Sequence, residues 1–141
     1  MSWKTPQPVE KPAPPPIKYL PGRFIFFPAS CFVGPDKIDP TNGSSVSATI
    51  KRLVSLAPNG ERFAAQYKRL NEAVSYCLAG AAILWGIAKA ARVDYSIMLY
   101  ITTAFLVGIA ILLERDSRAC FVRMVDEYNT FVAQGDRKTE R

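Results

Sequence analysis

The chain has 141 residues, of which 49 % are hydrophobic, and carries a net charge of +6. Nucleic-acid-binding proteins cluster Lys and Arg on one face or place them among exposed aromatic residues, and neither pattern occurs, so we expect no nucleic-acid partner. Histidine, the commonest metal ligand and general base, is absent. The cysteines Cys31, Cys77 and Cys120 lack the spacing of a metal or redox site, and no phosphate loop or nucleophile motif is found. We therefore expect no catalytic residues, no bound metal and no cofactor.

Residues 1 to 43 hold ten of the eleven prolines and are predicted to form an extended arm. Within it, the Phe-rich stretch from Arg23 to Pro35 could include a strand, although Pro28 interrupts it. This stretch could pack on the protein's own helices or lie on the surface of a partner. We expect the second arrangement, because the flanking prolines oppose folding back into a core. The predicted partner-binding side chains are Phe24, Phe26, Phe27 and Phe32.

A short amphipathic helix is predicted over residues 44 to 58. Ser44 or Ser45 can cap its start, and the run from Pro58 to Gly60 ends it. Asn59 can then cap the following helix. The apolar positions of the short helix recur with helical period at Val46, Ile50, Leu53 and Val54.

A long helix is predicted from about residue 61 to about residue 90. Nothing interrupts it before the charge-free run from Ala73 to Ala88. Its second part is therefore expected to enter a membrane. Its first part is amphipathic, with apolar residues at spacings of four, three and four, namely Phe63, Tyr67, Leu70 and Val74.

Two membrane spans are predicted, over residues 73 to 91 and 95 to 113. The second contains no charge, and its nineteen residues cover about 28 Å as a helix, close to the ~30 Å hydrocarbon core. The first reaches spanning length if Lys89 extends its ammonium group to the headgroups. Residues 92 to 94 would then form the turn of a hairpin. A single broken span is one alternative, and a soluble hairpin is disfavoured because so short a chain has little left to cover the second run.

Small residues recur at every fourth position on both predicted spans, and such residues let membrane helices approach closely. Ala82 and Ala104 are equally far from a turn near Val93, so they would meet at the same depth in an antiparallel hairpin. We therefore expect the two spans to pack through Ala82, Gly86, Ala90, Ala104 and Gly108.

An amphipathic helix is predicted over residues 114 to 134, with Gly135 placed to end it and residues 136 to 141 as a tail. Its apolar stripe could pair with the stripe of the first long helix as a two-helix stalk, or it could bind a partner. The sequence does not separate these possibilities. The stripe consists of Phe121, Met124, Val125, Tyr128 and Val132.

Basic residues favour the side of the two termini, with six near the outer span ends against two, Lys89 and Arg92, at the turn. The positive-inside rule then places both termini in the bacterial cytosol or the mitochondrial matrix. Basic clusters at the headgroup level bind anionic lipids such as cardiolipin. The residues predicted to do so are Lys68, Arg69, Arg115 and Arg118.

The predicted fold is an all-α membrane protein, in which residues 59 to 135 form a two-span transmembrane helical hairpin with helices that extend beyond the bilayer and with an extended Pro-rich N-terminal arm. We expect a non-catalytic accessory subunit of a multi-subunit membrane complex, in the respiratory chain or ATP synthase of the mitochondrial inner membrane. Its partners would be other subunits and membrane lipids. The alternative is a prokaryotic or phage membrane hairpin, either a holin-like pore former or a secretion-system component.

Overall fold

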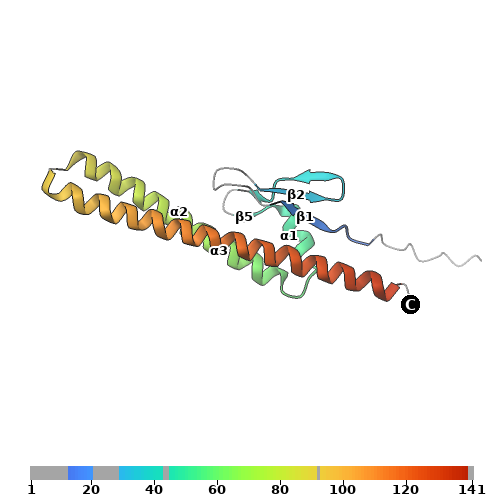
Figure 1. The fold of residues 1–141 in the computed structure, drawn as a ribbon. Helices are drawn as coiled ribbons and strands as arrows, with labels where there is room; N and C mark the ends of the chain where they lie inside the picture. The colour runs from blue at the N-terminus through green and yellow to red at the C-terminus, as the bar shows by residue number, and fades with distance from the viewer. Residues whose placement is uncertain (1–12, 21–28, 43–44, 92, 140–141) are drawn as a thin grey trace, which may run out of the picture.

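The computed structural model describes residues 13–20, 29–42, 45–91 and 93–139. Two long antiparallel helices form a hairpin, and a small sheet and a short helix pack on one side of it, far from the turn (Figure 1). The prediction of an all-α fold is therefore wrong in one part of the chain. The strands are β1 (Ile17–Leu20), β2 (Ser30–Val33), β3 (Asp36–Ile38), β4 (Thr41–Asn42) and β5 (Ser45–Val46), and the helices are α1 (Ala48–Val54), α2 (Gly60–Ala90) and α3 (Val93–Thr139).

Helices α2 and α3 each contain a segment long and apolar enough to cross a membrane. Only 17 % of the apolar window in α2 and 6 % of that in α3 is buried inside the protein. The hairpin therefore leaves most of its apolar surface uncovered, as a core helix of a soluble protein would not. The large exposed side chains of these segments include Tyr76, Ile83, Trp85, Ile97, Met98, Ile101, Phe105 and Leu112.

The two helices pack along a narrow seam. On α2 the buried positions recur every seventh residue at Val74, Ala81 and Ala88, and on α3 the seam includes Ala110 and Ser117. A spacing of seven keeps one face of a slightly coiled helix against its partner. A Cβ at Gly80 would lie 3.7 Å from the side chain of Leu106, which sets the relative depth of the two helices.

Beyond the apolar segments the two helices continue as a stalk with an aromatic core. The rings of Tyr67 and Phe121 lie 5.4 Å apart, centroid to centroid, in an edge-on arrangement. Met124 and Tyr128 on α3 are fully buried in the same cluster. The apolar stripes of α2 and α3 therefore pair with each other, which settles a choice that the sequence left open.

Strands β1, β2 and β3 form an antiparallel meander, one face of which packs on this stalk. Ile17 is 2 % exposed and Cys31 is 0 % exposed, and both belong to the same core as the stalk residues. The backbone N–H of Ile17 donates to Oδ1 of Asn129 at 2.9 Å, and Nδ2 of Asn129 donates to the carbonyl of Ile17 at 2.8 Å. The Tyr128 hydroxyl donates to the carbonyl of Pro15 at 2.8 Å.

These contacts correct the expectation of an extended arm, because its described residues fold back onto the protein's own helices. Prolines do not prevent this, since they lie outside the paired strand residues and a Pro carbonyl still accepts a hydrogen bond. We refer to the five strands and α1 together as the headpiece. Phe24, Phe26 and Phe27 lie outside the described residues.

Helix α1 ends at Val54 instead of near residue 58, and α3 begins at Val93, inside the predicted turn.

Three further details of the helix ends differ from prediction. Ser45 belongs to β5, so α1 begins later, after Ser47, whose side chain makes no capping bond. Asn59 precedes α2, but its amide donates to Oε1 of Glu127 at 3.0 Å instead of capping the helix. Gly135 does not end α3, which continues to Thr139.

Gly60 allows the tight connection between α1 and α2. A Cβ at this position would overlap the carbonyl group of Val54, so only glycine fits without a backbone shift. The connection between α1 and α2 therefore requires glycine at position 60.

Candidate functional site

The predicted small-residue contact does not hold the two helices of the chain together. Ala82, Gly86, Ala90, Ala104 and Gly108 are exposed, and a Cβ on Gly86 or Gly108 would meet nothing within 4 Å. Ala82 and Ala104 do lie level, since each is two residues from the contact between Gly80 and Leu106. The prediction that Ala82 and Ala104 lie at the same depth is confirmed. The prediction that these residues face each other across the two helices is wrong. The observed seam on α2 lies at Ala81 and Ala88, one and two positions away from the predicted residues.

The stalk meets the apolar segments at a plane marked by one acidic residue on each helix. Glu72 and Glu114 are the last charged residues before the apolar runs, and both are equally far from the Gly80–Leu106 contact. Each pairs with a cation one turn further along the stalk. The Lys68 ammonium lies 3.8 Å from Glu72, and Nε of Arg118 lies 3.0 Å from Glu114.

The four predicted lipid-binding cations therefore fall into two classes. Lys68 and Arg118 are engaged by neighbouring carboxylates, whereas Arg69 and Arg115 are exposed and make no ion pair within the described part of the chain. The exposed Lys68–Glu72 pair contributes only about 0.3–0.5 kcal/mol, so Lys68 can exchange its carboxylate for a lipid phosphate. The Glu114–Arg118 pair is half-buried. The lipid assignment stays a prediction.

The Glu114–Arg118 pair lies beside two tyrosines that connect the sheet to the stalk. The ring of Tyr19 packs against that of Phe121 in a tilted arrangement, with 4.9 Å between the ring centroids. Burial raises the pKa of Tyr19, and burial together with the nearby Glu114 raises the pKa of Tyr67 to about 12. Both phenols therefore stay protonated at neutral pH and can act as hydrogen-bond donors there.

Strand β1 runs towards the apolar segments. Ile17 contacts α3 at Asn129, and Tyr19 contacts α3 at Phe121, closer to the apolar segments. Leu20 pairs with Ser30 at the end of the sheet nearest those segments.

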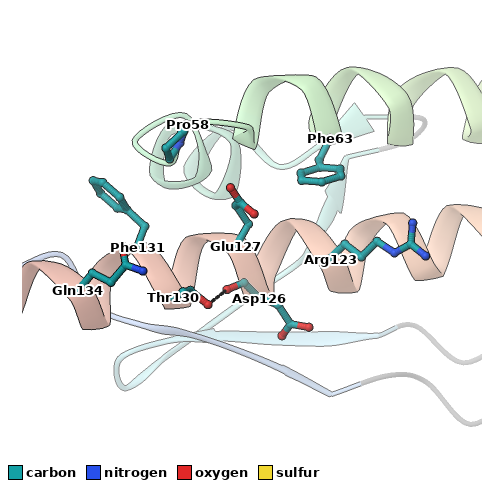
Figure 2. A pocket seen from close by; sticks show the side chains of 8 residues that line it. All are labelled: Pro58, Phe63, Arg123, Asp126, Glu127, Thr130, Phe131 and Gln134. Atoms are coloured by element: carbon teal, nitrogen blue, oxygen red, sulfur yellow. Dashed lines mark hydrogen bonds between the residues drawn. The ribbon is translucent and has the colours of Figure 1, made fainter.

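A groove runs along the stalk between α2 and α3, with a volume of about 500 Å³ (Figure 2). Phe63 of α2 and Glu127 of α3 point into the gap between the helices, and Phe131 points towards Pro58 at the end of the groove. A smaller hollow of about 260 Å³ shares Phe63 with it and continues towards the apolar segments. The remaining residues that line the larger groove are Arg123, Asp126, Thr130 and Gln134.

Two of the polar side chains of the groove are engaged within the protein. Glu127 accepts from Asn59, and the Thr130 hydroxyl donates to the backbone carbonyl of Asp126 at 2.8 Å. The groove is therefore lined by a mixture of apolar and charged groups.

The three cysteines occupy separate places. Cys31 lies under the sheet, the Cys120 thiol is 3.5 Å from the carbonyl oxygen of Phe63, and Cys77 lies within the apolar part of α2. Burial, together with Asp39, raises the pKa of the Cys31 thiol to about 11, so this thiol is inert at neutral pH. Among residues 13–20, 29–42, 45–91 and 93–139, no group of three or more Cys, Asp or Glu residues is placed to hold a metal ion.

The sequence did not indicate which residues join the sheet to the stalk. Asn129 and Tyr19 make the contacts that join the sheet to the stalk. In the sequence, Asn129 reads as an ordinary polar position on an amphipathic helix. The alternation of Ile17, Lys18, Tyr19 and Leu20 could have indicated a strand. Phe32, predicted to bind a partner, lies on β2 and is half-buried on the face of the sheet that points away from the helices.

Comparisons with protein-family models, curated proteins and solved structures found no match.

Proposed function

We propose that this chain is a non-catalytic membrane subunit, in which α2 and α3 cross a bilayer as a hairpin and hold the headpiece at one membrane surface. The observation that carries this proposal is the exposed apolar surface around both helices, of which little is buried within the chain. In water such a surface would cost free energy at about 25 cal/mol per Å². In a bilayer the same side chains contact lipid tails.

The lengths support this arrangement. The apolar segments of the two helices begin at the same level, at Glu72 and Glu114, and end together at the turn. Each covers roughly 27 Å along the helix axis, close to the ~30 Å hydrocarbon core. The described ends of the chain, near Pro15 and Thr139, both lie on the headpiece side.

The role of an accessory subunit is supported by surfaces that the chain leaves uncovered. The stalk groove is lined by Phe63 and by the half-exposed Phe131. The outer face of the sheet presents Phe32. A subunit that works by contact needs such surfaces, and a bilayer covers neither of them, because both belong to the part of the protein beyond the apolar segments.

For the compartment, we propose the mitochondrial inner membrane, with the headpiece in the matrix and with a respiratory or ATP synthase complex as the assembly. The excess of basic residues on the headpiece side supports the orientation through the positive-inside rule. Arg69 and Arg115, exposed at the boundary plane, would contact the anionic headgroups of that membrane.

One observation favours a second candidate function, a homo-oligomeric prokaryotic or phage hairpin of the holin type. The small residues Gly86 and Gly108 are exposed on the apolar segments with open space around them. Exposed small residues on membrane helices let further helices approach closely, and those helices could belong to other copies of the same chain.

The two functions are separated by purifying the tagged chain in a mild detergent and identifying what comes with it by mass spectrometry. Stoichiometric copurification with respiratory or synthase subunits supports the accessory role. Recovery of a homo-oligomer alone, together with dye release from vesicles, refutes it and supports the pore former.

The topology has its own test. Cysteines introduced at Lys51 in α1 and at Lys138 near the end of α3, both exposed, should react with a membrane-impermeant maleimide from the same side of the membrane. Reaction from opposite sides would mean a single span and would refute the hairpin insertion.

A further inference from the structure

The outer face of the three-stranded sheet carries a cross-strand row of two lysines with a phenylalanine between them. Lys18 of β1 is paired with Phe32 of β2, and Phe32 is paired with Lys37 of β3. Residues directly opposite each other in an antiparallel sheet point to the same side. Their sequence neighbours Tyr19, Cys31 and Ile38 pack on the core, so the row points away from the helices.

The row is cationic, and none of the described residues places a carboxylate on its face of the sheet. Lys18 and Lys37 are exposed, and neither makes an ion pair within the described ranges. The two carboxylates of this region lie elsewhere. Asp36 is opposite Val33, which belongs to the inward-facing set, and Asp39 accepts the backbone N–H of Thr41 at 3.1 Å.

The direction of this face decides what can reach it. The sheet lies along the side of the stalk, with its inner face on α3 (Figure 1). Its outer face is therefore directed away from the stalk, roughly perpendicular to the hairpin axis. If the hairpin crosses a bilayer, this face is directed along the plane of the membrane and meets a neighbouring protein before it meets lipid headgroups.

We propose that this face docks an acidic segment of a neighbouring subunit, with Phe32 as its apolar centre and Lys18 and Lys37 as the flanking cations. This inference rests on the proposed function of the chain as a subunit of a membrane complex. Adjacent strands are about 4.8 Å apart, so the two lysine backbones lie about 10 Å apart. The complementary partner presents two carboxylates at about that spacing on either side of an apolar side chain, and it contributes to specificity and association rate through charge.

The test is a charge reversal, Lys18→Glu with Lys37→Glu, in the full-length tagged chain. The control is Arg137→Glu with Lys138→Glu, which reverses two exposed cations at the far end of α3 and leaves the sheet unchanged. Both variants are purified in mild detergent, and the partner subunits recovered per tagged chain are measured over a series of salt concentrations.

We expect the sheet variant to recover at least tenfold less partner than the wild type at low salt, and the control to recover as much as the wild type. Recovery by the wild type should also fall as salt rises, because exposed charge pairs are screened. Loss of fold is checked through Cys31, which lies beneath the row and should stay protected from maleimide. If the glutamate variant loses that protection, Lys18→Gln with Lys37→Gln replaces it and should reduce recovery by a smaller factor.

Three results overturn the proposal. Unchanged recovery by the folded sheet variant means that the lysines only keep edge strands from pairing with other chains, which glutamate does equally well. Normal recovery combined with lost binding to anionic vesicles means that the face binds lipid. If the wild type recovers no partner at all, the subunit function fails as well, which distinguishes that outcome from the other two.

Discussion

Asn129 is expected to be the main polar link between the sheet and the stalk, and its removal should release β1 from α3. Its side chain both accepts from and donates to the backbone of Ile17, at 2.9 and 2.8 Å. Asn129→Ala removes both bonds and leaves the N–H and C=O of Ile17 without these partners in a position that is 2 % exposed. At about 1 kcal/mol for each bond, with an added penalty for groups left buried and unpaired, the local cost is about 2–3 kcal/mol.

The assay follows the opening of the sheet through Cys31, which is 0 % exposed beneath it. A maleimide reacts with this thiol only when the sheet detaches, because the folded thiol is both covered and protonated. If opening is fast relative to labelling, a cost of 2–3 kcal/mol makes Cys31 react about 30- to 150-fold faster. Mass spectrometry of the peptide that contains Cys31 separates it from Cys77 and Cys120.

The matched control is Thr130→Ala, one residue further along α3. Among the described residues, the exposed Thr130 hydroxyl bonds to the carbonyl of Asp126 within its own helix and to no part of the sheet, so the labelling rate of Cys31 should change by less than about threefold. An Asn129→Ala variant whose Cys31 reacts at the wild-type rate would refute the reasoning. It would show that apolar contacts alone hold the sheet in place.

Three further predictions concern the rest of the fold. Gly60→Ala should lower the free energy of unfolding by about 3 kcal/mol in denaturant titrations, because the new methyl group overlaps a backbone carbonyl. Gly135→Ala, in an open part of α3, should raise the free energy of unfolding by about 0.5–1 kcal/mol. Ala81→Leu should destabilise the hairpin by about 1–3 kcal/mol in thermal unfolding, while Ala82→Leu, which is exposed, should change it by less than about 0.5 kcal/mol, and equal effects would contradict the seam. Finally, the free energy of unfolding of the headpiece should fall as pH rises from about 9 to about 11, because the Cys31 thiol of the unfolded chain ionises first, and Cys31→Ala should reduce this slope.

The membrane-like hairpin could be predicted from the sequence because it depends on local properties. A span needs only a charge-free apolar run of sufficient length, and the charges between residues 89 and 94 mark the place where two such runs meet. The same properties predicted the start of α2 to within one residue and the equal depth of Ala82 and Ala104. None of these conclusions requires knowing which residues touch.

The facing of the two helices could not be predicted, because it depends on a rotation that the composition does not encode. Ala81 and Ala82 are the same residue type and differ by about 100° around the helix axis. In water, the contrast between apolar and polar faces would choose between them. On an apolar segment that contrast is missing, so only the packed pair shows that Ala81 is inside and Ala82 is outside.

The end of α3 was also decided beyond the local sequence. Gly135 usually marks a helix end, but here it lies inside a helix that continues to Thr139. Glycine costs about 1 kcal/mol within a helix, an amount that a helix anchored by Tyr128 and Val132 in the stalk core can absorb.

The sequence by itself determined a hairpin of two helices that are long and apolar enough to cross a membrane and that continue past their apolar segments, because length, apolarity and helical period are local properties of the sequence. Only the tertiary structure decided that the described part of the Pro-rich N-terminal region, residues 13–20 and 29–42, folds onto the stalk. The contacts responsible join Ile17 to Asn129, 112 residues away, and such pairings leave no periodic trace in either segment. Short strands gain their stability from the surface on which they pack, so these strands depend on the surface that α2 and α3 present.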